Sequence, residues 1–154
     1  MAIDNPRYTP VSQPHQGFGD FAAFYPFYLG EHCLPATRRL HLAGTTIALS
    51  ASARAVASLA PRSILVIREL LMSSPLKAGT LHRLIEWALM RTVVWRLDGS
   101  LKLVMGGIIS AYAFAWTAHF FVENNKPATF TYPVWSLRGD LKLWWEVVTL
   151  QRGY

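Results

Sequence analysis

The chain has 154 residues and a formal charge of +6, and only 16% of its residues are charged while 52% are hydrophobic. This length suits one domain, and the charged share lies well below the quarter that is typical of soluble proteins. The basic residues are scattered singly or in pairs, which excludes the usual pattern of a nucleic-acid-binding protein and favours membrane lipid as a partner. The single cysteine, Cys33, excludes a disulfide framework within the chain and a multi-cysteine zinc site.

The N-terminal part contains a polar segment followed by an aromatic one. Residues 1–16 are polar and rich in proline, so we expect an extended polar N-terminal arm, and we expect residues 17–154 to form a single helical membrane domain. Residues 17–29 (GFGDFAAFYPFYL) predict a short helix bent at Pro26, because proline removes a backbone donor. Such a helix suits either the membrane interface or the cap of a core.

A long helix is predicted next, over residues 35–61. It exceeds the roughly 20 residues that cross a bilayer, provided that Arg54 reaches the interface or meets a partner group. Small side chains recur along it and permit close contact with another helix. They are Ala43, Gly44, Ala48, Ser50, Ala51, Ser52, Ala53, Ala55 and Ala57.

The middle of the chain predicts shorter helices, followed by a second span. Residues 62–73 are apolar but too short to cross a bilayer alone, residues 74–80 indicate a turn, and residues 80–97 form an amphipathic helix. We expect these helices at the interface or packed in a bundle. After a turn at Asp98–Gly99, residues 101–122 have the length and composition of a transmembrane helix.

The C-terminal part predicts a loop and a last amphipathic helix. Pro133 favours an extended loop, and the helix is expected from Asp140 onwards, after Gly139. Trp144 and Trp145 suit the membrane–water boundary. The predicted fold class is therefore all-α, a small polytopic helical membrane protein with two to four spans plus interfacial amphipathic helices.

His119 and Glu123 are four residues apart in the motif AWTAHFFVENNKPATF. On an α-helix this spacing places both side chains on one face. They could share a metal ion, or the carboxylate could hold the second nitrogen of a ligating imidazole. An ordinary hydrogen bond or a solvated helix end is the commoner meaning of such a pair.

His32 and His41 lie in a second motif, EHCLPATRRLHLAGT. An even number of crossings between the two motifs would place the start of the first span and the end of the last on one side of the membrane. His32, His41 and His119 then converge near one interface, and three imidazoles suit Fe, Zn or another divalent metal ion. An open coordination position would permit oxygen or water chemistry.

Other polar residues of these segments have simpler interpretations. His15 and His82 are expected to be exposed to solvent and are not counted as ligands. Arg38 and Arg39 could bind a carboxylate or a lipid phosphate, although basic residues at the end of a span commonly set its orientation.

Three segments together resemble the small membrane-protein family that includes the 2-hydroxy fatty acid dioxygenases of fatty acid α-oxidation. The resemblance covers about residues 24–49 and 108–150. It rests on the order and spacing of YPFYLGEHCLPATRRLHLAGT, YAFAWTAHFFVENNKPATFTYP and VWSLRGDLKLWW. It implies a membrane enzyme that uses Fe(II) and O₂ to shorten a 2-hydroxy fatty acid by one carbon. It also implies the endoplasmic reticulum if the chain is like the characterised eukaryotic members, and otherwise a bacterial inner or organellar membrane.

The resemblance also implies roles for particular residues. The recurring histidines of the family fall on His32, His41 and His119, which would hold Fe(II), and its acidic residue falls on Glu123. Glu123 would then be a ligand or a partner of one, and Arg38 or Arg39 would meet the carboxylate of the fatty acid substrate. We list Glu123 and Arg38 as candidate catalytic residues.

The chain departs from the resemblance in its middle, where arginines interrupt the apolar sequence. This departure suggests an alternative function: a non-catalytic structural subunit that keeps the fold and contacts partner membrane subunits through residues 54–102. The arginines are Arg54, Arg62, Arg68, Arg83, Arg91 and Arg96.

Overall fold

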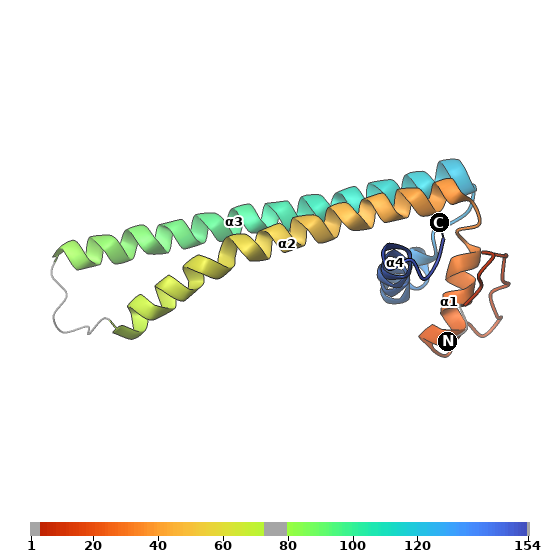
Figure 1. Ribbon diagram of the computed structural model, residues 1–154, viewed down its shortest axis with the longest axis horizontal. Coiled ribbons are helices and arrows are strands. Elements are labelled where there is room, and N and C mark those ends of the chain that lie inside the picture. The colour runs from red at the N-terminus through yellow and green to blue at the C-terminus, as the bar shows by residue number, and fades with distance from the viewer. Residues whose placement is uncertain (1–3, 73–79, 154) are drawn as a thin grey trace. The chain divides into compact units, whose positions relative to one another are not determined.

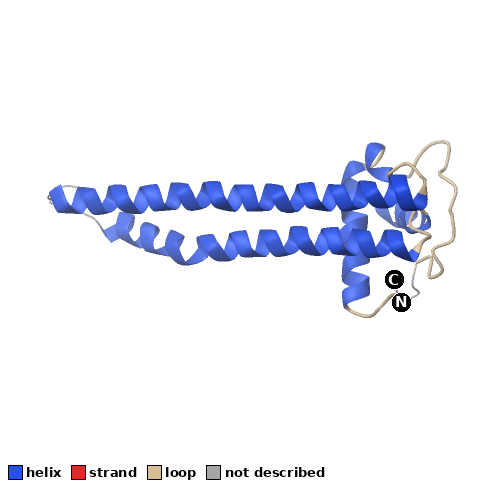
Figure 2. Cartoon of the chain, turned by 90° about the horizontal axis from the view of Figure 1, so that it is seen from above, coloured by secondary structure: helices blue, strands red, loops and turns tan. Residues whose placement is uncertain are grey.

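The structure is a computed structural model that describes residues 4–72 and 80–153, and the side chains of these residues except those at 60–72, 80–83, 85, 86 and 96. The described residues form helices and loops and no strand, which confirms the all-α prediction (Figure 2). The elements in chain order are α1 (Phe21–Gly30), α2 (Pro35–Met72), α3 (Thr80–Thr117), the π-helical turn η1 (Ala118–Glu123), the 3₁₀ turn η2 (Ala128–Phe130) and α4 (Pro133–Val148) (Figure 1).

Both predicted breaks in the long helices are wrong. Helix α2 continues through Pro61, so the expected separate helix over 62–73 is part of it, and α3 continues through Asp98 and Gly99. In α3 the Lys102 ammonium donates a hydrogen bond of 2.7 Å to the Asp98 carboxylate, one helical turn earlier. A glycine such as Gly99 lowers the stability of a helix by only about 1 kcal/mol relative to alanine. Local breakers are tolerated because the helix on each side is long. Residues 74–79 of the predicted turn at 74–80 lie outside the described residues.

Among the residues that the structure describes, two segments are long and apolar enough to cross a membrane, judged by length and composition. They are Pro35–Leu59 and Trp87–Glu123. The first lies within the predicted helix over 35–61, and the second contains the predicted span over 101–122. Both therefore fall where the sequence places spans.

The chain divides into two compact units, and the second comprises Ala48–Ile108. In this unit small residues let α2 and α3 approach closely: a Cβ added at Gly107 would lie 2.8 Å from Cβ of Ala51. The hydroxyl groups of Ser58 and Ser100 also form a hydrogen bond of 2.9 Å between the two helices. The prediction that small residues permit close helix contact is confirmed at these positions.

The first unit comprises Met1–Ile47 and Ile109–Tyr154, and its core is the aromatic face of α1 packed on α4. Asp20 begins α1, because its side chain accepts a hydrogen bond from the Ala23 amide at 2.8 Å. Helix α4 begins at Pro133 and not in an extended loop as predicted, since proline suits the first turn of a helix. The buried core residues are Tyr8, Phe24, Tyr25, Phe27, Tyr28, Leu29, Leu143 and Val147.

The N-terminal arm is attached to this core through Tyr8. The Tyr8 side chain is buried, and its hydroxyl donates a hydrogen bond to the Gly153 carbonyl at 2.6 Å. Arg152 donates to the Asn5 carbonyl at 3.0 Å, and the Arg38 guanidinium lies 3.8 Å from the centre of the Tyr8 ring. The arm is therefore polar in sequence but anchored, both by the buried Tyr8 ring and by hydrogen bonds of Asn5.

Candidate metal centre

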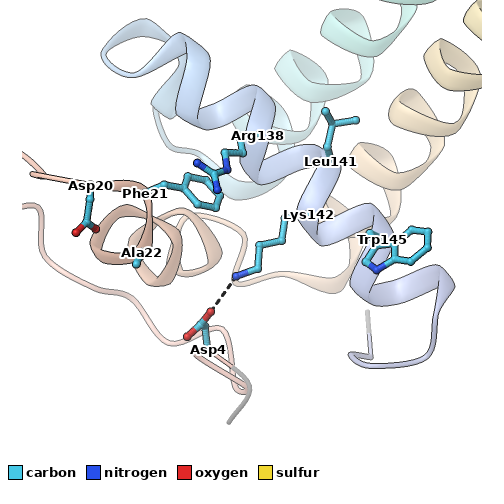
Figure 3. Close-up of a pocket in the computed structure, with 8 residues that line it drawn as sticks. All are labelled: Asp4, Asp20, Phe21, Ala22, Arg138, Leu141, Lys142 and Trp145. Atoms are coloured by element: carbon cyan, nitrogen blue, oxygen red, sulfur yellow. Dashed lines mark hydrogen bonds and ion pairs between the residues drawn. The ribbon is translucent and has the colours of Figure 1, made fainter. Parts of the chain in front are cut away.

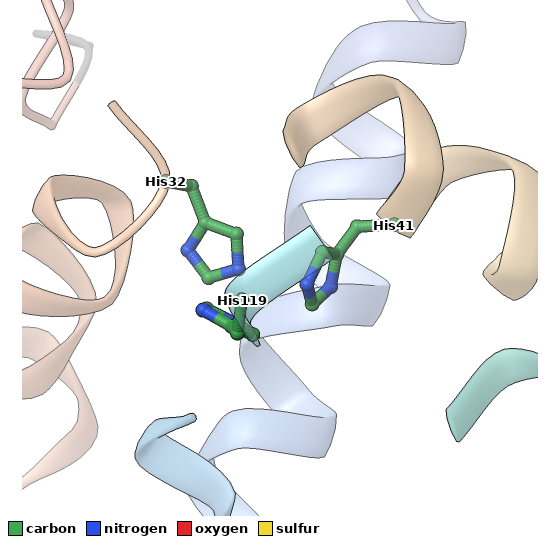
Figure 4. A group of neighbouring side chains, drawn as sticks. All are labelled: His32, His41 and His119. Carbon is green, nitrogen blue, oxygen red and sulfur yellow. The ribbon is translucent and has the colours of Figure 1, made fainter. Parts of the chain in front are cut away.

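Three histidines from three separate segments meet in the first unit (Figure 4). His32 follows α1, His41 lies in the second turn of α2, and His119 lies in η1. Each is almost fully buried, at 1%, 6% and 3% relative exposure respectively. One ring nitrogen of each lies within 4.8 Å of one ring nitrogen of the other two. The structure therefore brings together the three predicted metal ligands.

The position of His119 depends on the π-helical turn. A π-helix is wider than an α-helix, is rare, and is frequently found at functional sites. The turn ends at Asn124, which adopts the left-handed conformation with φ of 56°, a conformation that asparagine tolerates better than most residues. Consequently His119 and Glu123 do not follow the α-helical spacing on which their predicted pairing depends.

Each histidine ring uses its Nδ1 atom in a hydrogen bond. His32 contacts the Tyr28 carbonyl at 2.6 Å, His41 the Asp140 carboxylate at 2.7 Å, and His119 the Asn125 side-chain oxygen at 2.7 Å. These oxygens accept hydrogen bonds, so each Nδ1 carries the proton and each Nε2 keeps its lone pair. The result is three imidazoles oriented to ligate through Nε2.

The orientation of the Asn125 amide is fixed by its own donors. Its nitrogen donates to the Glu31 carbonyl at 3.1 Å and to the Glu31 carboxylate at 3.0 Å. The amide oxygen is therefore the atom that faces His119. Asn125 thereby fixes the tautomer of His119 in the way that Asp140 fixes that of His41.

The Nε2 atoms of His32 and His41 fit a metal ion. Both are buried and have no hydrogen-bond partner, which is costly for a polar atom unless a ligand completes it. Burial holds the pKa of His32 well below its usual value, and the neighbouring His41 and His119 add to this effect. The ring is therefore neutral, as a ligand must be. A set of three imidazole ligands suits Zn, Cu, Fe or Ni.

Asp140 connects two parts of the site. Its Oδ1 atom accepts hydrogen bonds both from His41 and from the Tyr28 hydroxyl, at 2.7 Å and 2.5 Å. The Tyr28 ring reaches Asp140 because the preceding residue of α4 is Gly139: a Cβ there would lie 2.8 Å from the ring. Asp140 and Gly139 thus link the packing of α1 on α4 to the orientation of a ligand.

Glu123 lies at the N-terminus of α2 and not against His119. Its carboxylate accepts hydrogen bonds from the amides of Cys33 and Leu34, at 2.7 Å and 3.3 Å, and from the Thr37 hydroxyl. A carboxylate at this position satisfies unpaired helix donors and interacts favourably with the helix dipole. The predicted pairing of Glu123 with the second nitrogen of His119 is wrong, because Asn125 takes that nitrogen. A catalytic role for Glu123 stays a prediction.

Arg38 supports the segment that carries His32. Its guanidinium is buried and donates hydrogen bonds to the carbonyls of His32 and Cys33, at 2.7 Å and 2.6 Å. Its Nε atom is buried and has no partner. Contact between Arg38 and a substrate carboxylate stays a prediction.

The sequence interpretation missed Asp140, Asn125 and Tyr28 as partners of the ligands. The signal that could have found them is their place in the segments that carry the resemblance: Asp140 lies within VWSLRGDLKLWW, and Asn125 lies two residues after Glu123 in the motif of His119. Of the two histidines not counted as ligands, His15 is exposed as expected. The side chain of His82 lies outside the described residues.

The comparisons with known proteins agree with the resemblance. The family described as 2-hydroxy-palmitic acid dioxygenase Mpo1-like matches residues 18–152. No curated protein and no solved structure gives a significant match. The family match covers all three histidines, Asp140 and Asn125, together with every helix of the fold. The chain belongs to the Mpo1-like family of 2-hydroxy-palmitic acid dioxygenases and their relatives.

Proposed function

We propose that the chain is a membrane enzyme that uses Fe(II) and O₂ to shorten 2-hydroxy fatty acids by one carbon. The observation that carries this proposal is the convergence of His32, His41 and His119, with each Nδ1 occupied by a protein acceptor. The family match supports the reaction class.

The reaction class selects among the metals that three imidazoles suit. Zinc has no redox chemistry, so it cannot support the transfer of electrons to O₂. Fe(II) supplies that redox chemistry when it is bound. A 2-hydroxy acid and one O₂ balance to a fatty acid one carbon shorter, CO₂ and water, so no further reductant is required.

The protein groups around the site orient the histidine rings and exclude water from them. Asp140 and Asn125 hold the His41 and His119 rings at fixed angles, while the burial of all three rings removes competing water. No carboxylate belongs to the three-nitrogen set, so none of the candidate ligands repels the carboxylate of a hydroxy acid, while the Asp140 carboxylate lies behind His41 and pairs with its Nδ1 atom.

The two apolar segments and the proposed substrate class support a membrane location. His41 lies near the beginning of Pro35–Leu59 and His119 near the end of Trp87–Glu123. The site is thus at the ends of both candidate spans, where a long acyl chain can remain in lipid while its polar end reaches the histidines. This matches the predicted assembly of the site from opposite ends of the chain.

Metal analysis tests the proposal. Protein purified anaerobically with iron supplied is expected to contain one Fe per chain and to release CO₂ from 2-hydroxypalmitate only when O₂ is added. His119→Ala is expected to lose the metal and the activity, while His15→Ala, which changes an exposed histidine outside the cluster, keeps both. Wild-type protein without stoichiometric metal would contradict the proposal.

A structural subunit is the second candidate, favoured by exposed apolar residues in the unit Ala48–Ile108. Within the described part of residues 54–102, eight large apolar side chains are exposed. They are Val56, Leu84, Trp87, Met90, Val94, Trp95, Leu97 and Leu101. Much of this region, including the side chains at 60–72 and 80–83, lies outside the described residues. Native purification that yields a stable larger complex without metal would favour this candidate.

A further inference from the structure

Helix α4 has an apolar face that the protein does not cover. We call it the outer stripe of α4, and its residues are Val134, Leu137, Leu141, Trp145 and Val148, with exposures from 40% to 74%. At about 100° per residue these five positions fall within an arc of about 80°. The buried residues of α4, Ser136, Gly139, Leu143 and Val147, lie on the opposite side of the helix.

The outer stripe is unusual for a helix that faces water. A surface helix normally buries its apolar residues and places polar ones outwards, whereas α4 is apolar on both faces. Large exposed apolar surfaces with a polar border mark sites that bind a membrane or another protein. The question is which of these covers α4.

Basic residues on the border of the outer stripe favour a phospholipid surface. Arg138 and Lys142 line an open hollow of about 820 Å³ between α4 and the start of α1, beside Leu141 and Trp145 (Figure 3). Two carboxylates, those of Asp4 and Asp20, also line this hollow on the side of the N-terminal segment and α1. Lys142 pairs with Asp4 at 3.0 Å. The Arg138 guanidinium lies 4.1 Å from the centre of the Phe21 ring, and its side chain is exposed. Arg138 can therefore donate to a phosphate beside the stripe.

The contact of α4 with α2 also favours a membrane surface as the occupant of the outer stripe. The Trp144 indole donates a hydrogen bond of 2.9 Å to the Thr46 hydroxyl, and Thr46 belongs to the candidate span Pro35–Leu59. Figure 1 views α4 nearly along its axis while the adjoining part of α2 runs across the picture, so the two helices cross. Within this compact unit α4 runs steeply across the first turns of α2, residues 35–47. If these turns enter the membrane, this arrangement suits a helix that lies along the membrane plane, where an amphipathic helix inserts its apolar face.

We propose that α4 lies in the membrane interface, with its outer stripe among the acyl chains and Arg138 bound to a phospholipid phosphate. This inference rests on the membrane location proposed above but not on metal binding or dioxygenase activity. At about 100° per residue Trp145 lies at the edge of the exposed arc, next to the position of Arg138, and tryptophan suits the membrane–water boundary. The hollow lined by Arg138 has room for a phospholipid headgroup.

Spin labels in lipid nanodiscs test the position of the stripe. In a Cys33→Ala background, labels are attached to Leu137→Cys and Leu141→Cys, with Ser12→Cys as the water-exposed control and Val56→Cys as the control within a candidate span. Labels at positions 137 and 141 are expected to collide several-fold more often with O₂, which dissolves in lipid, than with a water-soluble nickel complex. The label at position 12 is expected to show the reverse preference.

A second measurement tests the phosphate contact. Spin-labelled phosphatidylglycerol and phosphatidylcholine are compared for association with the wild-type protein, with Arg138→Gln and with Arg7→Gln, which removes an exposed arginine far from the stripe in sequence. Arg138→Gln is expected to lower the preference for the anionic lipid by up to about fivefold. Arg7→Gln is expected to lower it much less.

Each contrary outcome has a distinct meaning. Labels at 137 and 141 that prefer the nickel complex would place the stripe in water and overturn the inference. Labels that exclude both reagents would show that a protein, and not lipid, covers the stripe, and this too would overturn it. If the label at Val56 also prefers nickel, the proposed membrane location fails together with this inference, whereas a lipid-exposed Val56 confines the failure to α4. Equal effects of the two arginine substitutions would overturn the phosphate contact.

Discussion

Replacement of Asp140 by asparagine tests whether the hydrogen bond to His41 orients a metal ligand. The Asp140 carboxylate accepts hydrogen bonds from His41 Nδ1 at 2.7 Å and from the Tyr28 hydroxyl at 2.5 Å. Asparagine keeps the size of the side chain but removes its charge, and its nitrogen can accept neither bond. The Asp140→Asn variant should therefore fold, with a less firmly held His41 ring.

The size of the effect follows from the change in hydrogen-bond strength. Bonds to a charged group contribute about 1.5–3 kcal/mol and neutral bonds about 0.5–1.5 kcal/mol, so the His41 bond weakens by about 1–1.5 kcal/mol. Since about 1.4 kcal/mol corresponds to a factor of ten, Fe(II) affinity should fall about tenfold. This is the lower end of the range of about 10- to 100-fold for groups that orient metal ligands.

Competition with a coloured ferrous chelator under anaerobic conditions measures this affinity. Glu146→Gln is the matched control, because Glu146 is also a carboxylate of α4 that accepts a tyrosine hydroxyl, from Tyr25 at 2.8 Å, but it has no histidine partner. The control should lower thermal stability and leave Fe(II) affinity unchanged. Equal Fe(II) affinities for wild-type protein and Asp140→Asn would refute the reasoning.

Three further predictions concern stability, measured by denaturation of the metal-free protein in detergent. Glu123→Gln should lower the free energy of unfolding by about 0.5–2 kcal/mol, because it weakens the cap of α2; unchanged stability would show that the cap contributes nothing. Gly139→Ala should cost about 1–3 kcal/mol, because its Cβ would lie 2.8 Å from the Tyr28 ring, whereas Gly153→Ala, with no atom within 4 Å of its Cβ, should cost far less. Because burial lowers the pKa of His32, the unfolded chain binds a proton there that the folded chain does not. Stability should therefore fall with decreasing pH below about 6.5, by up to about 1.4 kcal/mol per pH unit, and less steeply in His32→Gln; parallel pH profiles for the two proteins would contradict this.

Local sequence patterns were least reliable at the helix boundaries. Pro61 and the pair Asp98–Gly99 are strong local breakers, yet both lie inside long helices. Pro133 begins α4 although it was expected in a loop. In each case a preference of about 1–3 kcal/mol at one residue competes with the hydrogen bonds and contacts of many neighbours, which the sequence window does not contain.

The ligand set was more predictable than the groups around it. His32, His41 and His119 were chosen because the ends of two spans lie on one side of a membrane when the chain crosses it an even number of times, and they do meet. Glu123 was chosen from α-helical spacing, which fails because the chain forms a π-helical turn there. The turn ends at Asn124 in the left-handed conformation, and the next side chain, Asn125, contacts His119 and Glu31.

The sequence by itself determined the helical class, the two apolar segments, the three histidines and the family, because each depends on residue type and order along the chain. Only the tertiary structure decided that Asp140 and Asn125 orient the rings, that Glu123 caps α2, and that the outer stripe of α4 is exposed. The physical reason is that these contacts join residues 6 to 99 positions apart. Hydrogen bonds and burial depend on distance in space, and packing of α1 and α2 against α4 sets that distance.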